Sequence, residues 1–91
     1  MIEDDIKLLK CVGNKIRYKI LNLLENEEKC VSEIMNELDE EQSLISHHLK
    51  ALRNCGLIVK KREGKNVIYS LSTSEVPEFL KKVKKLSKDT C

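Results

Sequence analysis

The spacing of apolar residues along this chain changes at Gly56, and that change limits the folds that the chain can adopt. Before Gly56, apolar residues recur every three or four positions, which is the period of helices with one buried face. After it, the runs LIVKKR and NVIYSLS shift to the two-residue period of β-strands. The residues that join these runs, EGKN, predict a hairpin turn with Gly64 or Asn66 at positive φ. The sequence therefore predicts a mostly α-helical chain with a small β-hairpin.

Five helices are expected around that hairpin. Four precede it, over about residues 2–12, 15–25, 32–38 and 43–55, with Ser32 capping the third, and one follows it from about residue 74. At 91 residues the whole chain, 1–91, is expected to form a single domain with a thin core. Apolar stripes on the first and last helices would face water in a monomer, so we expect them to form the interface of a homodimer. These stripes hold Ile2, Ile6, Leu9, Phe79, Leu80, Val83 and Leu86.

The charge of the chain is divided unevenly between its two halves. Residues 1–42 hold six Lys and Arg against eleven Asp and Glu (net −5), whereas residues 43–91 hold eleven against four (net +7). The second half is therefore suited to an anionic partner. No apolar run approaches the roughly 20 residues that span a bilayer, and the N-terminal MIEDDIK is acidic where a signal peptide is basic. We expect a cytoplasmic protein with no membrane partner.

The expected fourth helix has a polar face opposite its apolar one, and a basic hairpin follows it. Three helices, a polar-faced helix and a charged hairpin, in that order, are the parts of a winged helix-turn-helix. Short Ser and His side chains let such a helix enter the major groove of DNA, while Lys and Arg neutralise phosphates. Aromatic residues make up only 3% of the chain, which disfavours stacking on RNA or single strands and favours duplex DNA. The expected DNA contacts are Gln42, Ser43, Ser46, His47, Lys50, Arg53, Lys61, Arg62 and Lys65.

The two histidines of the chain are adjacent, and neighbours on a helix point about 100° apart. His47 shares the polar face and is interpreted as a DNA contact or as solvated surface. His48 lies near the apolar side, where a hydrogen-bonded packing role is expected. Cys55 is seven residues from His48, but a nucleophilic pair there lacks an orienting third group, so no enzyme is expected.

The stretch SLISHHLKALRNCGLIVKKREGKNVIYSLS resembles the signature of the ArsR/SmtB repressors, S-x-x-S-x-H-L-x-x-L-x-x-x-G-L-V followed by R-x-G-(K/R)-x-x-x-Y-x-L. Upstream, NKIRYKILNLL is similar to D-x-x-R-x-x-I-L-x-x-L, with Asn14 in place of Asp. The resemblance covers about residues 5–86. It implies a homodimeric winged-helix repressor that an inorganic effector releases from operator DNA, with the first and last helices in the dimer interface.

Four cysteines stand at positions 11, 30, 55 and 91, without a CxxC motif. In a reducing compartment they are expected to be thiols. Three thiolates drawn from Cys11, Cys30, Cys55 and Cys91 would suit As(III), Cd(II) or Pb(II) as effector. A reversible disulfide or persulfide is the alternative signal, and ordinary packing is the third interpretation. A winged helix that binds a partner protein instead of DNA remains a further alternative.

The resemblance divides the metal-sensing relatives into three classes. One uses a Cys-Val-Cys on the third helix, of which this chain keeps Cys30 but has Ser32 in place of the second thiol. A zinc-binding class uses His on the last helix, and residues 74–91 contain none. The cadmium and lead class uses thiols resembling Cys55 and Cys91, with Ala51 where another thiol is expected.

Overall fold

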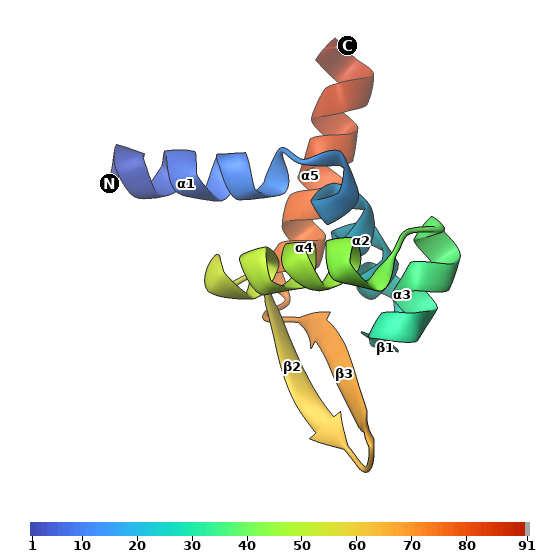
Figure 1. Cartoon of the computed structure of the whole chain (residues 1–91). Coiled ribbons are helices and arrows are strands. Elements are labelled where there is room, and N and C mark those ends of the chain that lie inside the picture. Colours follow the sequence, from blue (N-terminus) through green and yellow to red (C-terminus); the bar gives the residue numbers. More distant parts are fainter. Residues whose placement is uncertain (91) are drawn as a thin grey trace.

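The computed structural model describes residues 1–90, which form helices and a small sheet in an order close to the expected one (Figure 1). The elements are α1 (Ile2–Val12), α2 (Lys15–Asn26), β1 (Lys29–Cys30), α3 (Val31–Leu38), α4 (Gln42–Asn54), β2 (Ile58–Glu63), β3 (Asn66–Leu71) and α5 (Glu75–Thr90). None of these helices is long and apolar enough to cross a membrane, as far as residues 1–90 are concerned.

Local interactions explain where the helices begin and end. Asn14 caps α2, because its side-chain oxygen accepts hydrogen bonds from the backbone N–H groups of Ile16 (2.9 Å) and Arg17 (3.1 Å). α3 begins at Val31, so the expectation that Ser32 caps it is wrong. The carboxylate of Glu33 instead accepts from the backbone N–H of Cys30 (3.0 Å), so the cap lies two residues earlier than Ser32.

The end of α4 and the hairpin turn both use glycine where the backbone is left-handed. Gly56 follows α4 with φ 79°, and Gly64 lies in the turn between β2 and β3 with φ 60°. The hairpin pairs Ile58 with Leu71 at its base and Glu63 with Asn66 at its tip. The predicted hairpin and its turn at Gly64 are therefore confirmed.

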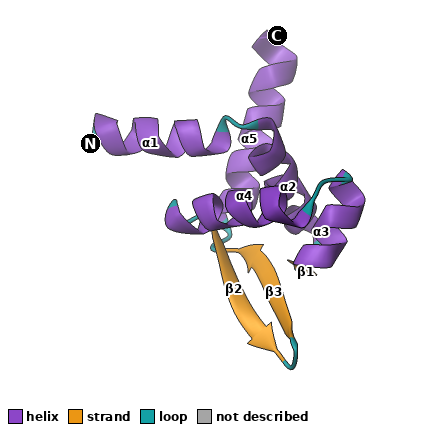
Figure 2. Ribbon diagram, in the orientation of Figure 1, coloured by secondary structure: helices purple, strands orange, loops and turns teal. Residues whose placement is uncertain are grey.

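The sheet contains one strand more than the sequence predicted. Its strand order is β1-β3-β2, all antiparallel, because Lys29 and Cys30 pair with Tyr69 and Ile68 of β3. The short strand β1 lies between α2 and α3 in the chain and attaches both helices to the middle of β3 (Figure 2).

The core forms where α2, α3 and α4 meet beneath the first half of α5. The largest side chains that are fully buried there are Ile20, Leu21, Ile34, Ile45, Leu49, Leu52 and Leu80. Leu80 has no exposed surface, so it packs in the core of its own chain and is not available for the predicted dimer interface. The arrangement is a winged helix-turn-helix, in which α3 and α4 are the helix pair and β2–β3 is the wing.

The projecting parts of the molecule lie on different sides. Figure 1 shows the β2–β3 hairpin extending away from α4, while α1 and the C-terminal half of α5 leave the body on other sides. The wing and the exposed end helices are thus free to serve separate contacts.

Candidate nucleic-acid interface

The polar face of α4 is open to solvent along its length. Gln42, Ser43, Ser46, His47 and Lys50 are all exposed, and Arg53 is half-buried. On the opposite side, Ile45, Leu49 and Leu52 are buried and hold the helix against the core. Every α4 side chain that the sequence assigned to DNA therefore lies on one accessible face or at its edge.

His48 has the packing role that the sequence predicted. It is 6% exposed, and its Nδ1 accepts a hydrogen bond from Nε of Arg17 on α2 (3.0 Å). Burial lowers the pKa of His48 most strongly, and electrostatic repulsion from the neighbouring Arg17 and His47 side chains lowers it further. The imidazole is therefore neutral at pH 7, with its proton on Nε2, and it joins α4 to α2.

The two histidines contact each other although they point in different directions. Their ring centroids are 5.1 Å apart with an edge-to-face geometry, and His47 remains exposed. His47 therefore stays available for a ligand while His48 does not.

The wing carries its basic residues on exposed positions, but they differ in what surrounds them. Nζ of Lys61 lies 3.2 Å from a carboxylate oxygen of Glu63 and 3.5 Å from one of Glu28, and these acids raise the pKa of Lys61, Glu63 most strongly. Arg62 and Lys65 are exposed and have no ion pair within residues 1–90. Of the three predicted wing contacts, these two are therefore the freer cations.

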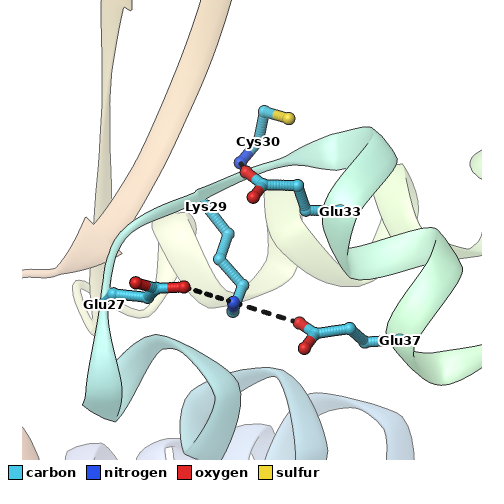
Figure 3. Close-up of polar contacts among 5 residues, drawn as sticks. All are labelled: Glu27, Lys29, Cys30, Glu33 and Glu37. Atoms are coloured by element: carbon cyan, nitrogen blue, oxygen red, sulfur yellow. Dashed lines mark hydrogen bonds and ion pairs between the residues drawn. The ribbon is translucent and has the colours of Figure 1, made fainter.

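Lys29 is a buried charged residue whose structural role the sequence did not predict. Its ammonium lies 3.1 Å from Glu27 and 3.1 Å from Glu37, and its side chain is only 9% exposed (Figure 3). The hydrogen bond to Glu27, followed by that to Glu37, raises the pKa of Lys29. Because Glu37 belongs to α3 and Lys29 to β1, this bridge fixes the first helix of the helix-turn-helix to the sheet.

Among residues 1–90, the structure brings together two of the cysteines proposed as metal ligands and leaves the third apart. Cys11 of α1 and Cys55 at the end of α4 form a disulfide, with 6.8 Å between their Cα atoms. Cys30 is a free thiol at the start of α3, 3.2 Å from the hydroxyl of Ser32. Cys91 lies outside the described residues. Within residues 1–90 no three Cys, His, Asp or Glu side chains gather in a way that would hold a metal ion.

An apolar surface covers the outer sides of α1 and α5. Ile2, Ile6, Leu9 and Leu86 are 70%, 45%, 60% and 61% exposed. Between the two helices lies a hollow of about 460 Å³, lined by Leu9, Val12, Gly13, Asn14, Lys15, Tyr18, Phe79 and Val83. Large exposed apolar side chains of this kind mark a surface that another molecule covers.

Comparison with known proteins gives a consistent match. Residues 14–60 match the family described as bacterial regulatory protein, arsR family. The transcriptional activator HlyU of Vibrio cholerae is 36% identical over 81 residues, which cover 89% of this chain and 75% of that protein. The cadmium resistance transcriptional regulatory protein CadC homolog of Staphylococcus aureus is 35% identical over 80 residues, covering 87% of this chain and 66% of that protein.

Solved structures share the fold as well. Reduced HlyU from Vibrio cholerae superposes with a TM-score of 0.83 at 34% identity, covering 92% of this chain and 88% of that chain. A homodimeric winged helix-turn-helix DNA-binding domain from Mycobacterium bovis superposes with a TM-score of 0.90 at 25% identity, covering 97% and 82%.

A helix-turn-helix with an exposed polar face on α4 and a basic wing defines a DNA-binding transcriptional regulator of the winged-helix class. Because the family match spans more than half of the chain and the relatives align along most of it, the chain belongs to the arsR family of regulatory proteins. Members of this family are regulators and not enzymes. The predicted resemblance to the ArsR/SmtB repressors is confirmed.

Proposed function

We propose that the chain is a homodimeric transcriptional repressor that inserts α4 into the major groove of operator DNA and lays the β2–β3 wing along the adjacent backbone or groove. The exposed polar face of α4, backed by buried Ile45, Leu49 and Leu52, carries this proposal. Short polar side chains on that face reach base edges, whereas Lys50, Arg53, Arg62 and Lys65 are placed to neutralise phosphates.

A gel-shift titration on a duplex selected from a random pool tests DNA binding. We expect the logarithm of the binding constant to fall linearly with the logarithm of salt concentration, by about 0.9 per phosphate contact. Arg62→Glu with Lys65→Glu should weaken binding by about 1–3 kcal/mol in total. Glu75→Gln, at the start of α5 on the opposite end of β3, is a matched surface control. If no duplex is bound above the non-specific level, the proposal fails and a protein-binding winged helix takes its place.

The dimer is proposed to form through the apolar surface of α1 and α5, made of Ile2, Ile6, Leu9, Phe79, Val83 and Leu86. The homodimeric Mycobacterium bovis neighbour supports the formation of a dimer, and the exposed apolar side chains of α1 and α5 favour these helices as its interface. Val83→Asp would place a charge in that surface, where desolvation costs several kcal/mol, and should yield monomers that lose operator binding. Sedimentation velocity reads the result. A dimeric Val83→Asp protein that still binds DNA would remove α5 from the interface.

The effector is proposed to act through thiols. The name of the Staphylococcus aureus relative ties that protein to cadmium resistance, which favours a thiophilic ion such as Cd(II), Pb(II) or As(III) as one candidate signal. Since only Cys11 and Cys55 lie together in the described chain, a third ligand would have to come from Cys91 or from the second subunit.

A titration of reduced protein with these three ions tests the metal route. Ion binding should produce ultraviolet thiolate-to-metal absorption together with loss of the gel shift, and Cys55→Ser should abolish both. Release by metal in a protein with all four cysteines replaced by serine would exclude a thiol site.

A further inference from the structure

Cys11 and Cys55 come from different functional parts of the chain. Cys11 lies in the last turn of α1, and Cys55 is the residue that ends α4, the proposed recognition helix. They are 44 positions apart in sequence, so the fold and not the local chain brings them together. A bond between them joins α1 directly to the end of α4.

The two sulfur atoms differ in access. Cys11 is 3% exposed, with its sulfur 3.7 Å from the carbonyl oxygen of Ala51, which also accepts from the backbone N–H of Cys55 (3.1 Å). Cys55 is exposed and lines a hollow of about 390 Å³ with Asp4, Lys7, Leu8 and Asn54. A small molecule therefore reaches Cys55 but not Cys11.

α1 has two faces with separate uses. Asp4, Lys7, Leu8 and Cys11 follow one another at helical spacing, and the first three line the hollow beside Cys55. The exposed apolar side chains Ile2, Ile6 and Leu9 lie on other sides of the same helix. In the proposed dimer, α1 thus contacts the partner subunit with one face and Cys55 of α4 with the other.

We propose that Cys11 and Cys55 form a redox-active dithiol site that reacts with low-molecular-weight disulfides, and that its oxidation weakens operator binding. This inference rests on the proposed function as a DNA-binding repressor. In the reduced protein, the end of α4 is attached to α1 only by non-covalent contacts such as that of the Cys11 sulfur with the carbonyl oxygen of Ala51. In the oxidised protein, the disulfide holds the end of α4 against α1. The two α4 helices of a dimer can then no longer shift to fit half-sites that lie one helical turn of DNA apart.

The reaction is thiol–disulfide exchange in two steps. The accessible Cys55 thiolate attacks one sulfur of a small disulfide RSSR, the S–S bond of RSSR breaks, and one RS⁻ leaves. The Cys11 thiolate then attacks the Cys55 sulfur, the bond to the second RS group breaks, and a second RS⁻ leaves. The two protons lost by the cysteines go to the two thiolates, so RSSR is reduced to two RSH while the dithiol is oxidised to the disulfide.

The test uses the 91-residue chain with Cys30→Ser and Cys91→Ser, which retains only the proposed pair. Samples are treated with reduced or oxidised glutathione, their oxidation state is read from alkylation and intact mass, and each is used to select and then titrate duplex DNA. We expect the oxidised protein to bind at least tenfold more weakly. Cys55→Ser in this background should bind equally well after either treatment, and circular dichroism establishes that it is folded. Cys30→Ser alone is the matched control that keeps the response.

The outcomes separate the two proposals. If neither redox form binds any duplex specifically, the proposed DNA-binding function fails. If both forms bind equally, if the oxidised form binds more tightly, if oxidised glutathione does not produce the disulfide, or if Cys55→Ser keeps the response, the redox inference fails while DNA binding stands.

Linkage gives an independent readout. DNA that prefers the dithiol must oppose its oxidation by the same factor. A tenfold preference per subunit corresponds to about 30 mV in the midpoint potential of this two-electron couple, which is measured in glutathione buffers with and without operator. A midpoint that DNA leaves unchanged contradicts the coupling.

Discussion

Removing the Arg17 guanidinium should show how much the link between α2 and the recognition helix contributes to stability. Arg17→Met keeps most of the aliphatic stem but leaves Nδ1 of His48 without its donor at 3.0 Å, inside a site where His48 is only 6% exposed. A hydrogen bond to a charged partner contributes about 1.5–3 kcal/mol, and an unsatisfied buried acceptor costs about 1–3 kcal/mol. We therefore expect the free energy of unfolding to fall by about 1.5–3 kcal/mol.

Urea denaturation followed by circular dichroism measures this change, and a double-mutant cycle isolates the hydrogen bond. His48→Leu removes the acceptor, so adding Arg17→Met to His48→Leu should cost much less than Arg17→Met alone. A coupling energy below about 0.5 kcal/mol would show that Arg17 acts through packing and not through His48.

The same site sets a pH dependence whose sign follows from the lowered pKa of His48. The pKa of His48 in the folded protein lies below the value of about 6.5 in the unfolded chain. The contribution of neutral His48 to the free energy of unfolding is therefore complete above a pH of about 6.5 and is lost as the pH falls through the pKa of the folded protein. The wild-type protein should thus lose stability between pH 7 and pH 5 more steeply than His48→Leu. Parallel curves for the two proteins would contradict the neutral, hydrogen-bonded histidine.

Two further predictions concern packing and backbone conformation. Leu80→Ala should lower the free energy of unfolding by about 2–5 kcal/mol, because Leu80 is fully buried. Leu86→Ala should change the stability of the isolated subunit by less than about 0.5 kcal/mol and instead weaken dimerisation. Urea denaturation measures the change in stability, and sedimentation velocity measures the change in dimerisation. Gly56→Ala should lower the free energy of unfolding by about 1–2 kcal/mol through backbone strain alone, because Gly56 has a φ of 79° and nothing lies within 4 Å of the added methyl group. An unchanged midpoint of thermal denaturation would refute this strain.

Features encoded within a few residues of one another were predictable from the sequence. The helical stripe of Ile45, Leu49 and Leu52 placed both the buried and the exposed face of α4, because a helix repeats within two turns. The hairpin turn at Gly64 was equally local. The exposure of His47 and the burial of His48 followed from the roughly 100° between neighbouring helical residues.

Features that depend on distant parts of the chain were not predictable. Arg17 meets His48 across 31 positions, and Cys11 meets Cys55 across 44, so no local pattern signals either pair. The two-residue strand β1 is too short to show an alternation and exists because β3 offers it a free edge. Leu80 was assigned to the wrong surface because a stripe on a helix does not reveal which neighbour covers it.

The uneven charge of the two halves sets a limit on how many phosphates the protein neutralises. Acidic residues of the first half bind basic residues of the second, since Glu28 lies 3.5 Å from Lys61 and Glu25 lies 3.5 Å from Lys84. The basic side chains left on α4 and the wing without an ion pair within residues 1–90 are Lys50, Arg53, Lys60, Arg62 and Lys65.

A dimer would therefore contact at most about ten phosphates through these surfaces. The slope of log K against log salt concentration should then be no steeper than about −9. Glu28→Gln with Glu63→Gln frees Lys61 and should steepen the slope by up to about 2, as one added contact per subunit requires. A wild-type slope well beyond −9, or a slope that this double variant leaves unchanged while its binding tightens, would mean that α4 and the wing are not the surfaces that meet the phosphates.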